Sequence, residues 1–235
     1  MKKVIILIGN YGSGKTEIAI NMAVKAAGEG KRTQVIDLDR INDYFRMSDH
    51  MKLLDEYDIG LISPTFAGSG VTQTNMPAAV ASAFDSDWDL VIFDVGGDPA
   101  GALSLARYHS DFTALAPGQL EVYDIINVKR PMSETPEKIL KLKGDMEGFA
   151  RQKVTAFVHN TNLQAWASAQ DLRDGYPVVK AASEMSGIPV VLTTGRKAFL
   201  YEFLEDKALD PAFIGSPLPL EPYMHRGIDD FTQGI

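Results

Sequence analysis

Short apolar segments, most of them rich in Val and Ile, recur along the whole chain and are separated by longer, more polar stretches. Several of these segments lack the strict alternation of a strand with one solvent-exposed face. Such runs are typical of strands that are covered on both faces. We therefore predict strands over residues 4–8, 34–38, 60–63, 90–95, 122–128, 154–158 and 189–192.

Segments with a helical period lie between the predicted strands. One follows Thr16 and stops at residues 28–30, where two glycines favour the end of a helix. A second is expected to begin at the pair Thr135-Pro136, a good N-cap and first-turn combination, and a third at Pro177. The positions expected to face the core are Ile18, Ala19, Met22, Ala23 and Ala26 in the first helix, Ile139, Leu142, Met146 and Phe149 in the second, and Val178, Val179, Ala182 and Met185 in the third.

The alternation of strands and helices predicts an α/β fold in three layers, with a mostly parallel sheet and helices on both faces. No shift in composition, repeat or low-complexity tract divides the chain, so residues 1–235 are predicted to form a single domain. The proline-rich tail, from about 210 to 235, is expected to be irregular. Residues in the 40s to 70s form the least regular internal stretch, and such stretches are often functional.

The composition restricts the chemistry that the chain can carry. It has no cysteine, which excludes disulfides, thiolate zinc sites, a Cys-ligated iron–sulfur cluster and a cysteine nucleophile. A net charge of -8 disfavours sequence-independent binding to nucleic acid or to an anionic membrane. The apolar start at 4–8 is too short for a signal peptide, so we expect a cytoplasmic protein. Metal-ligand spacing is absent among the histidines, which are His50, His109, His159 and His225.

A phosphate-binding motif follows the first predicted strand and opens the first predicted helix. Its sequence matches the P-loop pattern G-x-x-x-x-G-K-[ST] at every position. Glycines in such a loop allow backbone N–H groups to turn toward phosphate oxygens, and the positive end of the helix adds to the attraction. Lys15 is expected to reach the β- and γ-phosphates, and Thr16 to offer a hydroxyl to Mg²⁺. The loop comprises Gly9, Asn10, Tyr11, Gly12, Ser13, Gly14, Lys15 and Thr16.

Acidic residues at two strand ends complete the predicted phosphate site. Asp94 ends a buried strand and begins a D-x-x-G pattern, so Asp94 is predicted to hold Mg²⁺ through a water molecule and the Gly97 N–H to sense the γ-phosphate. Asp37 and Asp39 lie two residues apart and are expected to point the same way. One would order the waters of Mg²⁺ and the other orient the attacking water. The alternative is that these acids only cap strand ends and loop amides.

The order of these motifs resembles the ParA/MinD-like branch of P-loop ATPases, also called the CobQ/CobB/MinD/ParA group. The nearest resemblance is to uncharacterised bacterial ATP-binding proteins of that group, which carry sequences like those at 9–17, 37–46 and 94–102. It implies the three-layer P-loop NTPase fold. It also implies that Asp39 positions the hydrolytic water, which leaves Asp37 beside the metal, and that Asn160 recognises adenine.

The chain departs from this group at Asn10, where ParA and MinD proteins carry a lysine that reaches the partner's phosphates in a nucleotide-sandwich dimer. Its absence weakens the case for that dimer, and a homodimer stays one of the alternatives. The cluster-bridging cysteines of the nitrogenase iron protein and the basic C-terminal helix of MinD are also missing. Without the lysine we expect hydrolysis on the order of 10⁻⁴ to 10⁻² per second. A client protein or Arg46 would supply the missing charge, although Arg46 is also suited to a surface ion pair.

These features predict an ATPase whose Mg²⁺-dependent binding and hydrolysis of ATP switch its affinity for an unidentified protein client. ATP is favoured over GTP because residues 160–163 lack the aspartate of an N-K-x-D guanine motif. One alternative is an ATP-dependent small-molecule kinase or ligase of the dethiobiotin-synthetase type, with a substrate pocket built by residues 41–73. Another is a nucleotide-gated binding module with negligible turnover.

Overall fold

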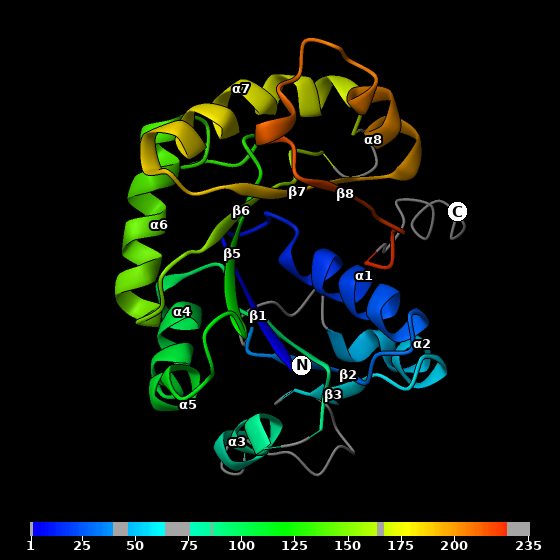
Figure 1. The fold of residues 1–235 in the computed structure, drawn as a ribbon, viewed down its shortest axis with the longest axis vertical. Coiled ribbons are helices and arrows are strands. Elements are labelled where there is room, and N and C mark those ends of the chain that lie inside the picture. The colour runs from blue at the N-terminus through cyan, green and yellow to red at the C-terminus, as the bar shows by residue number, and fades with distance from the viewer. Residues whose placement is uncertain (1, 40–46, 64–75, 86, 164–166, 225–235) are drawn as a thin grey trace, which may run out of the picture.

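Parallel strands form the centre of the molecule (Figure 1). The structure, a computed structural model, describes residues 2–39, 47–63, 76–85, 87–163 and 167–224. Its strands are β1 (Lys3–Ile8), β2 (Thr33–Asp37), β3 (Gly60–Ile62), β4 (Leu90–Asp94), β5 (Leu120–Ile126), β6 (Ala156–His159), β7 (Val190–Gly195) and β8 (Ser216–Pro219). They form one sheet in the order β3-β2-β4-β1-β5-β6-β7-β8, and every neighbouring pair is parallel. Each predicted strand segment contains a strand, so this part of the prediction is confirmed.

Helices cover both faces of the sheet. They are α1 (Lys15–Gly28), α2 (Met51–Glu56), α3 (Met76–Asp85), α4 (Pro99–Ala106), α5 (His109–Thr113), α6 (Pro136–Ala150), α7 (Ala169–Ser186) and α8 (Lys197–Leu204), with 3₁₀ turns at Met47–His50 and Pro211–Phe213. Along β1, the side chains of Val4 and Ile6 pack with α3 to α7, whereas those of Ile5 and Leu7 pack with α1 and α2. This arrangement confirms the three-layer α/β fold.

The tail contains a strand that the sequence analysis did not predict. Residues 216–219, expected to be irregular, form β8 and pair with β7 at the edge of the sheet. Leu220 continues this pairing, since its N–H donates to the Gly195 carbonyl at 2.8 Å. Pro217 and Pro219 alternate with the residues whose N–H groups face β7, so the positions without an N–H face outward. Prolines are therefore tolerated in this edge strand, which explains why their presence was misleading.

The third predicted helix begins eight residues earlier than expected, because Pro177 lies inside α7 rather than at its start. The helix begins after Ser168, whose N–H donates to the Asp171 carboxylate at 2.9 Å, half of a capping box. Two side chains expected in the core are instead exposed, Met185 in α7 and Phe149 in α6. Each lies three residues beyond a buried residue, which places it about 60° around the helix from the buried stripe. The remaining predicted core positions of α1, α6 and α7 are buried or partly buried against the sheet.

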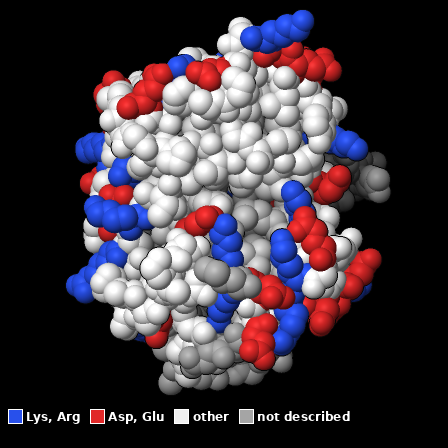
Figure 2. All heavy atoms as spheres, in the orientation of Figure 1, with Lys and Arg blue, Asp and Glu red and all other residues white. Residues whose placement is uncertain are grey.

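Positive and negative side chains are intermixed on the face of the molecule shown in Figure 2, without a continuous basic area. This distribution agrees with the acidic net charge of the chain. Among the helices that the structure describes, none is both long enough and apolar enough to cross a membrane.

Candidate phosphate-binding site

The carboxyl ends of the parallel strands meet along one edge of the sheet, where open α/β folds bind their ligands. The loops that follow β2, β4 and β6 bring Asp39, Gly97 and Asn160 to this edge, beside the P-loop after β1. Two cationic residues that the sequence analysis did not single out, Arg130 after β5 and Arg196 after β7, lie there too. Asp39, Asn160 and both arginines line one pocket together with the P-loop.

The P-loop has the backbone conformation of an anion-binding loop. Gly9, Gly12 and Gly14 have φ angles of 138°, 69° and 94°, which residues with a Cβ rarely adopt. At position 9 a Cβ would also lie 2.5 Å from the carbonyl oxygen of Ile125. Gly14 is the N-cap residue of α1 and has no side chain with which to cap that helix. The first N–H groups of α1 are therefore left for an anion at the pocket wall.

Lys15 is buried at the base of this loop. Its ammonium donates hydrogen bonds to the carbonyl oxygens of Gly9 and Asn10, at 3.2 and 3.0 Å. Burial lowers the pKa of Lys15, while the carboxylates of Asp94 and Asp39 oppose that shift. The cation is thus poorly compensated by the protein, and an anionic ligand would stabilise it.

Asp94 is a buried carboxylate without a hydrogen bond of good geometry to any described residue. Burial raises the pKa of Asp94 to about 6, against the opposing influence of the nearby Thr16 hydroxyl and Lys15 ammonium. A buried acid with unused oxygens requires a cation or a proton. Its position beside Thr16 is the one that the sequence analysis predicted for the metal.

Asp37 and Asp39 occupy different environments. Asp37 is aligned with Asp94 on the neighbouring strand, and it accepts hydrogen bonds from the Asp39 N–H at 3.0 Å and the Ser63 hydroxyl at 3.3 Å. Burial, and next the charge of Asp94, raise the pKa of Asp37 to about 8. Asp39 is half-buried and lines the pocket. Accepting the Asp39 N–H is the kind of loop cap that the alternative interpretation predicted, so that alternative describes part of what Asp37 does, whereas Asp39 borders the pocket.

The oxygen groups around Asp94 suit Mg²⁺. The Asp94 and Asp37 carboxylates and the Thr16 hydroxyl are hard oxygen donors, and the unused oxygens of Asp94 call for positive charge. In the described part of the chain, no group of three or more His, Asp or Glu side chains could bind a metal alone. Mg²⁺ commonly keeps several waters and takes further ligands from phosphates, so a site of this kind needs no protein cage.

These raised pKa values predict a pH-dependent stability for the ligand-free protein. Unfolded aspartates titrate near 3.9, so between about pH 4 and pH 8 the folded protein holds protons that the unfolded chain releases. Thermal stability should consequently fall as the pH rises from about 5 to about 8, and Asp37→Asn should reduce that fall. Melting curves over this range measure it. A slope that is identical in the wild type and in Asp37→Asn contradicts the assignment.

Gly97 lies directly against the P-loop. A Cβ on Gly97 would meet the Tyr11 nitrogen at 2.6 Å and the Asn10 carbonyl carbon at 2.9 Å. Gly101, in the first turn of α4, packs equally closely on Gly96. A Cβ on Gly101 would lie 2.6 Å from the Gly96 Cα. The loop after β4 is therefore in backbone contact with both the P-loop and the start of α4.

Asn160 has a structural role that the sequence analysis did not foresee. Its amide donates to the Ser13 carbonyl at 2.7 Å, and its side-chain oxygen accepts from the Thr194 hydroxyl at 2.6 Å. Asn160 is only 1% exposed, and it ties the P-loop to β7. Recognition of adenine by this residue stays a prediction.

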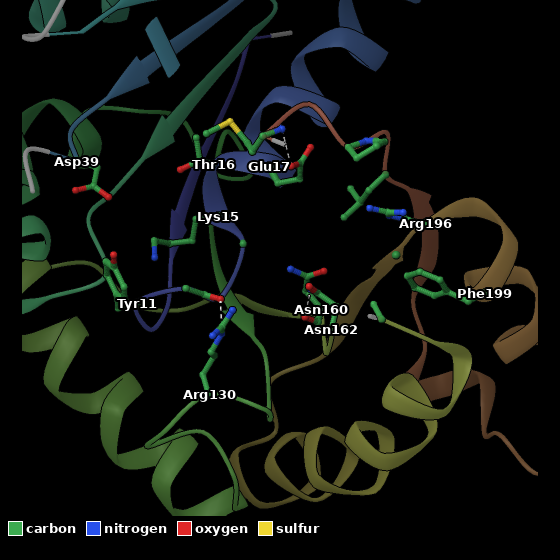
Figure 3. A pocket seen from close by; sticks show the side chains of 17 residues that line it. Tyr11, Lys15, Thr16, Glu17, Asp39, Arg130, Asn160, Asn162, Arg196 and Phe199 are labelled. Carbon is green, nitrogen blue, oxygen red and sulfur yellow. Dashed lines mark hydrogen bonds between the residues drawn. The ribbon is translucent and has the colours of Figure 1, made fainter. Parts of the chain in front are cut away.

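The pocket extends from the P-loop to a more apolar wall formed by α8 and the tail (Figure 3). Its volume is about 410 Å³, within the usual range for small-molecule sites. Glu17 of α1 anchors the tail by accepting the N–H groups of Tyr223 and Met224, at 2.8 and 2.9 Å. The lining residues that the sequence analysis missed include Glu17, Arg130, Asn162, Arg196, Phe199, Leu220 and Met224. Position after a strand could have indicated the two arginines, but no local pattern indicated the tail.

The other candidate residues lie elsewhere. Arg46 and His225 fall outside the described residues, as do residues 41–46 and 64–73 of the predicted substrate-site stretch 41–73. His159 is buried, and burial lowers its pKa to about 3. It packs against Phe203 at 6.0 Å between ring centroids, as a core residue would.

Comparisons with known proteins support the fold. The structure is similar to the cell division protein FtsY from Thermotoga maritima, with a TM-score of 0.55 and 20% identity over 83% of this chain and 62% of that one. For chloroplast FtsY from Physcomitrella patens the TM-score is 0.57 and the identity 16%, over 82% and 58% of the two chains. For the signal recognition particle receptor FtsY from Elizabethkingia anophelis, solved in complex with GDP, the TM-score is 0.54 and the identity 20%, over 83% of this chain and 57% of that one.

No family model and no curated protein matches the sequence. The chain spans about 60% of the length of the solved FtsY structures that it resembles. At these identities the similarity defines the fold class, which is that of the P-loop NTPases.

Proposed function

We propose that the protein is a Mg²⁺- and ATP-binding P-loop ATPase of the ParA/MinD-like group, acting as a slow nucleotide-dependent switch on a protein client. The observation that carries this proposal is the backbone contact between Gly97 and residues 10 and 11 of the P-loop. A γ-phosphate bound at the P-loop would lie beside this contact. Its presence or loss would therefore act on the loop after β4.

The close packing of Gly101 on Gly96 supports a path from this loop into α4. Asp98 caps α4 by accepting the Gly101 N–H at 2.6 Å, so the loop and the first turn of the helix form one hydrogen-bonded unit. Hence a shift at Gly97 would move the start of α4. A client that contacts α4 would distinguish the two nucleotide states.

Within this site the residues have separate roles. Lys15 and the N–H groups at the start of α1 bind the β- and γ-phosphates. Mg²⁺ would be held by Thr16 and, through water, by Asp94 and Asp37, and it would neutralise phosphate charge. Asp39, which borders the pocket, would orient the attacking water.

ATP rather than GTP is proposed because residues 160–163 lack a guanine-reading aspartate. One of the similar FtsY structures is a GDP complex, so binding should be compared between the two purine nucleotides. A small-molecule kinase or ligase remains the second candidate function, because the pocket continues beyond the P-loop to an apolar wall that includes Phe199 and Leu220.

The switch predicts a γ-phosphate-dependent change in hydrogen exchange. With Mg²⁺ and a non-hydrolysable ATP analogue, the amides of residues 95–98, 100 and 101 should exchange more slowly than with ADP, because the γ-phosphate orders the loop that touches the P-loop. Mass spectrometry of peptides covering this loop measures the difference.

Gly97→Ala is the informative variant for this experiment. Its Cβ cannot fit against the Tyr11 backbone, so the ATP-specific protection should disappear while ADP still binds. Gly144→Ala is the matched control, because nothing lies within 4 Å of a Cβ at that helical position. Equal protection from hydrogen exchange by the analogue and by ADP in the wild type would contradict the switch proposal.

A further inference from the structure

Arg130 reaches the P-loop from a segment more than a hundred residues away in the sequence. Its Nε–H donates to the Gly12 carbonyl at 2.9 Å, and the guanidinium borders the pocket. In Figure 3 Arg130 approaches the loop from the side of Asn160 and Asn162, whereas Lys15 lies toward Asp39. The two cations therefore flank the loop.

A hydrogen-bonded turn after β5 holds Arg130 in this place. Asn127 is 1% exposed; its side chain accepts the Lys129 N–H at 3.1 Å and donates to the Asn162 carbonyl at 3.0 Å. The Arg130 N–H closes the turn by donating to the Asn127 carbonyl at 3.1 Å. Arg130 thus extends from a fixed backbone.

Asn10 connects the same segment directly to the P-loop. Its amide donates to the Pro131 carbonyl and, at 3.3 Å, to the Ser133 hydroxyl. Asn10 occupies the P-loop position at which ParA and MinD proteins carry a lysine. In this chain the Asn10 side chain instead holds the backbone at Pro131, directly after Arg130.

The neighbouring cation, Lys129, has a different environment. It forms ion pairs with Asp174 at 2.8 Å and Asp171 at 3.2 Å, both of α7. Arg130 has no ion-pair partner among the described residues, and its one described side-chain bond is to an uncharged carbonyl. Its terminal N–H groups remain as donors at the pocket wall, and a guanidinium offers several donors in a fixed fork that suits phosphate oxygens.

We propose that Arg130 is a second phosphate-contacting cation of this site, supplied by the same chain. This inference rests on the proposed nucleotide-binding function and deepens it. The Nε–H anchors the guanidinium on Gly12, and the terminal nitrogens bind phosphate oxygens on the side of the loop away from Lys15. No client and no second subunit is then needed to supply the charge that Asn10 lacks.

A cation supplied in cis changes the expected rate. P-loop proteins without such a charge hydrolyse at about 10⁻⁴ per second, whereas those with an arginine in cis reach about 10⁻² per second. The isolated protein should therefore lie at the upper end of the slow range. Arg130→Ala should reduce its single-turnover rate about 100-fold.

The test compares three variants of the full chain, Arg130→Ala, Arg130→Lys and Lys129→Ala. Two quantities are measured with Mg²⁺: the single-turnover rate at saturating ATP, and the affinity for ADP with aluminium fluoride, which mimics the transferring phosphoryl group. Arg130→Ala should lose both, and Arg130→Lys should recover only part because it lacks the fork. Lys129→Ala removes the same unit charge from the adjacent residue and should match the wild type in both.

Two outcomes would overturn the role of Arg130. One is wild-type behaviour of Arg130→Ala in both measurements. The other is an equal loss of affinity for ADP with and without aluminium fluoride at an unchanged rate, which would show that Arg130 only supports the loop. Failure of the proposed function is distinct, because the wild type would then bind neither ATP nor GTP.

Discussion

Lys15→Ala is expected to weaken Mg²⁺-dependent ATP binding by about 2–5 kcal/mol, or roughly 30- to 5,000-fold, the cost of removing one partner of a buried, hydrogen-bonded charge pair. Lys15 is buried at the base of the P-loop, and its ammonium donates hydrogen bonds to two loop carbonyls. Phosphate oxygens would take the place of these carbonyls as acceptors when ATP binds. Isothermal titration with ATP and with ADP measures the loss.

The fold should survive this substitution. Burial disfavours the charged form of Lys15, so removing that cation from the interior should not unfold the protein. Melting curves check that point. Lys25→Ala, in the last turn of the same helix, is the matched control and should bind ATP like the wild type. Unchanged affinity in a folded Lys15→Ala protein would mean that the loop does not bind phosphate.

Asp39→Ala and Asp94→Ala should fail in different ways. Asp39 borders the pocket, so its loss should leave ATP binding nearly intact while single-turnover hydrolysis falls about 10²- to 10⁴-fold, as for loss of a general base. Asp94 is buried beside Thr16, and its loss should instead raise the Mg²⁺ concentration needed for ATP binding about 10- to 100-fold.

Metal titrations of binding and single-turnover assays, run on both variants, separate the two roles. Asp94→Asn should accompany Asp94→Ala, since it keeps the buried volume and removes only the charge. If the Asp39 and Asp94 variants show the same pattern of defects, the division between a water-orienting and a metal-binding acid is wrong.

The strands and the P-loop could be recognised without the structure because their determinants are local. A β-branched run that is apolar on both faces defines β1 or β4 wherever the rest of the chain lies, and the glycines of the P-loop specify its backbone within eight residues. Acids at the ends of β2 and β4 could likewise be placed near the loop, because the carboxyl ends of parallel strands share one edge.

Local signals misled where two of them competed. Pro177 marks a helix start in isolation, but the capping box at Ser168 and Asp171 begins the helix earlier. Pro217 and Pro219 suggest an irregular tail, yet at an edge strand their missing N–H groups face away from the partner. In both cases the surrounding structure, a capping box in one and an edge strand in the other, accommodated the proline, so the propensity of that single residue did not decide the outcome.

By itself, the sequence determined that this protein has a phosphate-binding loop between a buried strand and an amphipathic helix, with acids at the neighbouring strand ends. Only the tertiary structure decided how those acids divide, because burial separates Asp94 and Asp37 from the pocket-lining Asp39. It also decided that Asn160 links the loop to β7, that Glu17 anchors the tail beside the pocket, and that Arg130 bonds to the Gly12 carbonyl. The physical reason is distance along the chain: the bonds of Gly12 to Arg130, of Ser13 to Asn160 and of Glu17 to Tyr223 join residues 118 to 206 positions apart, and no local pattern encodes such a pairing.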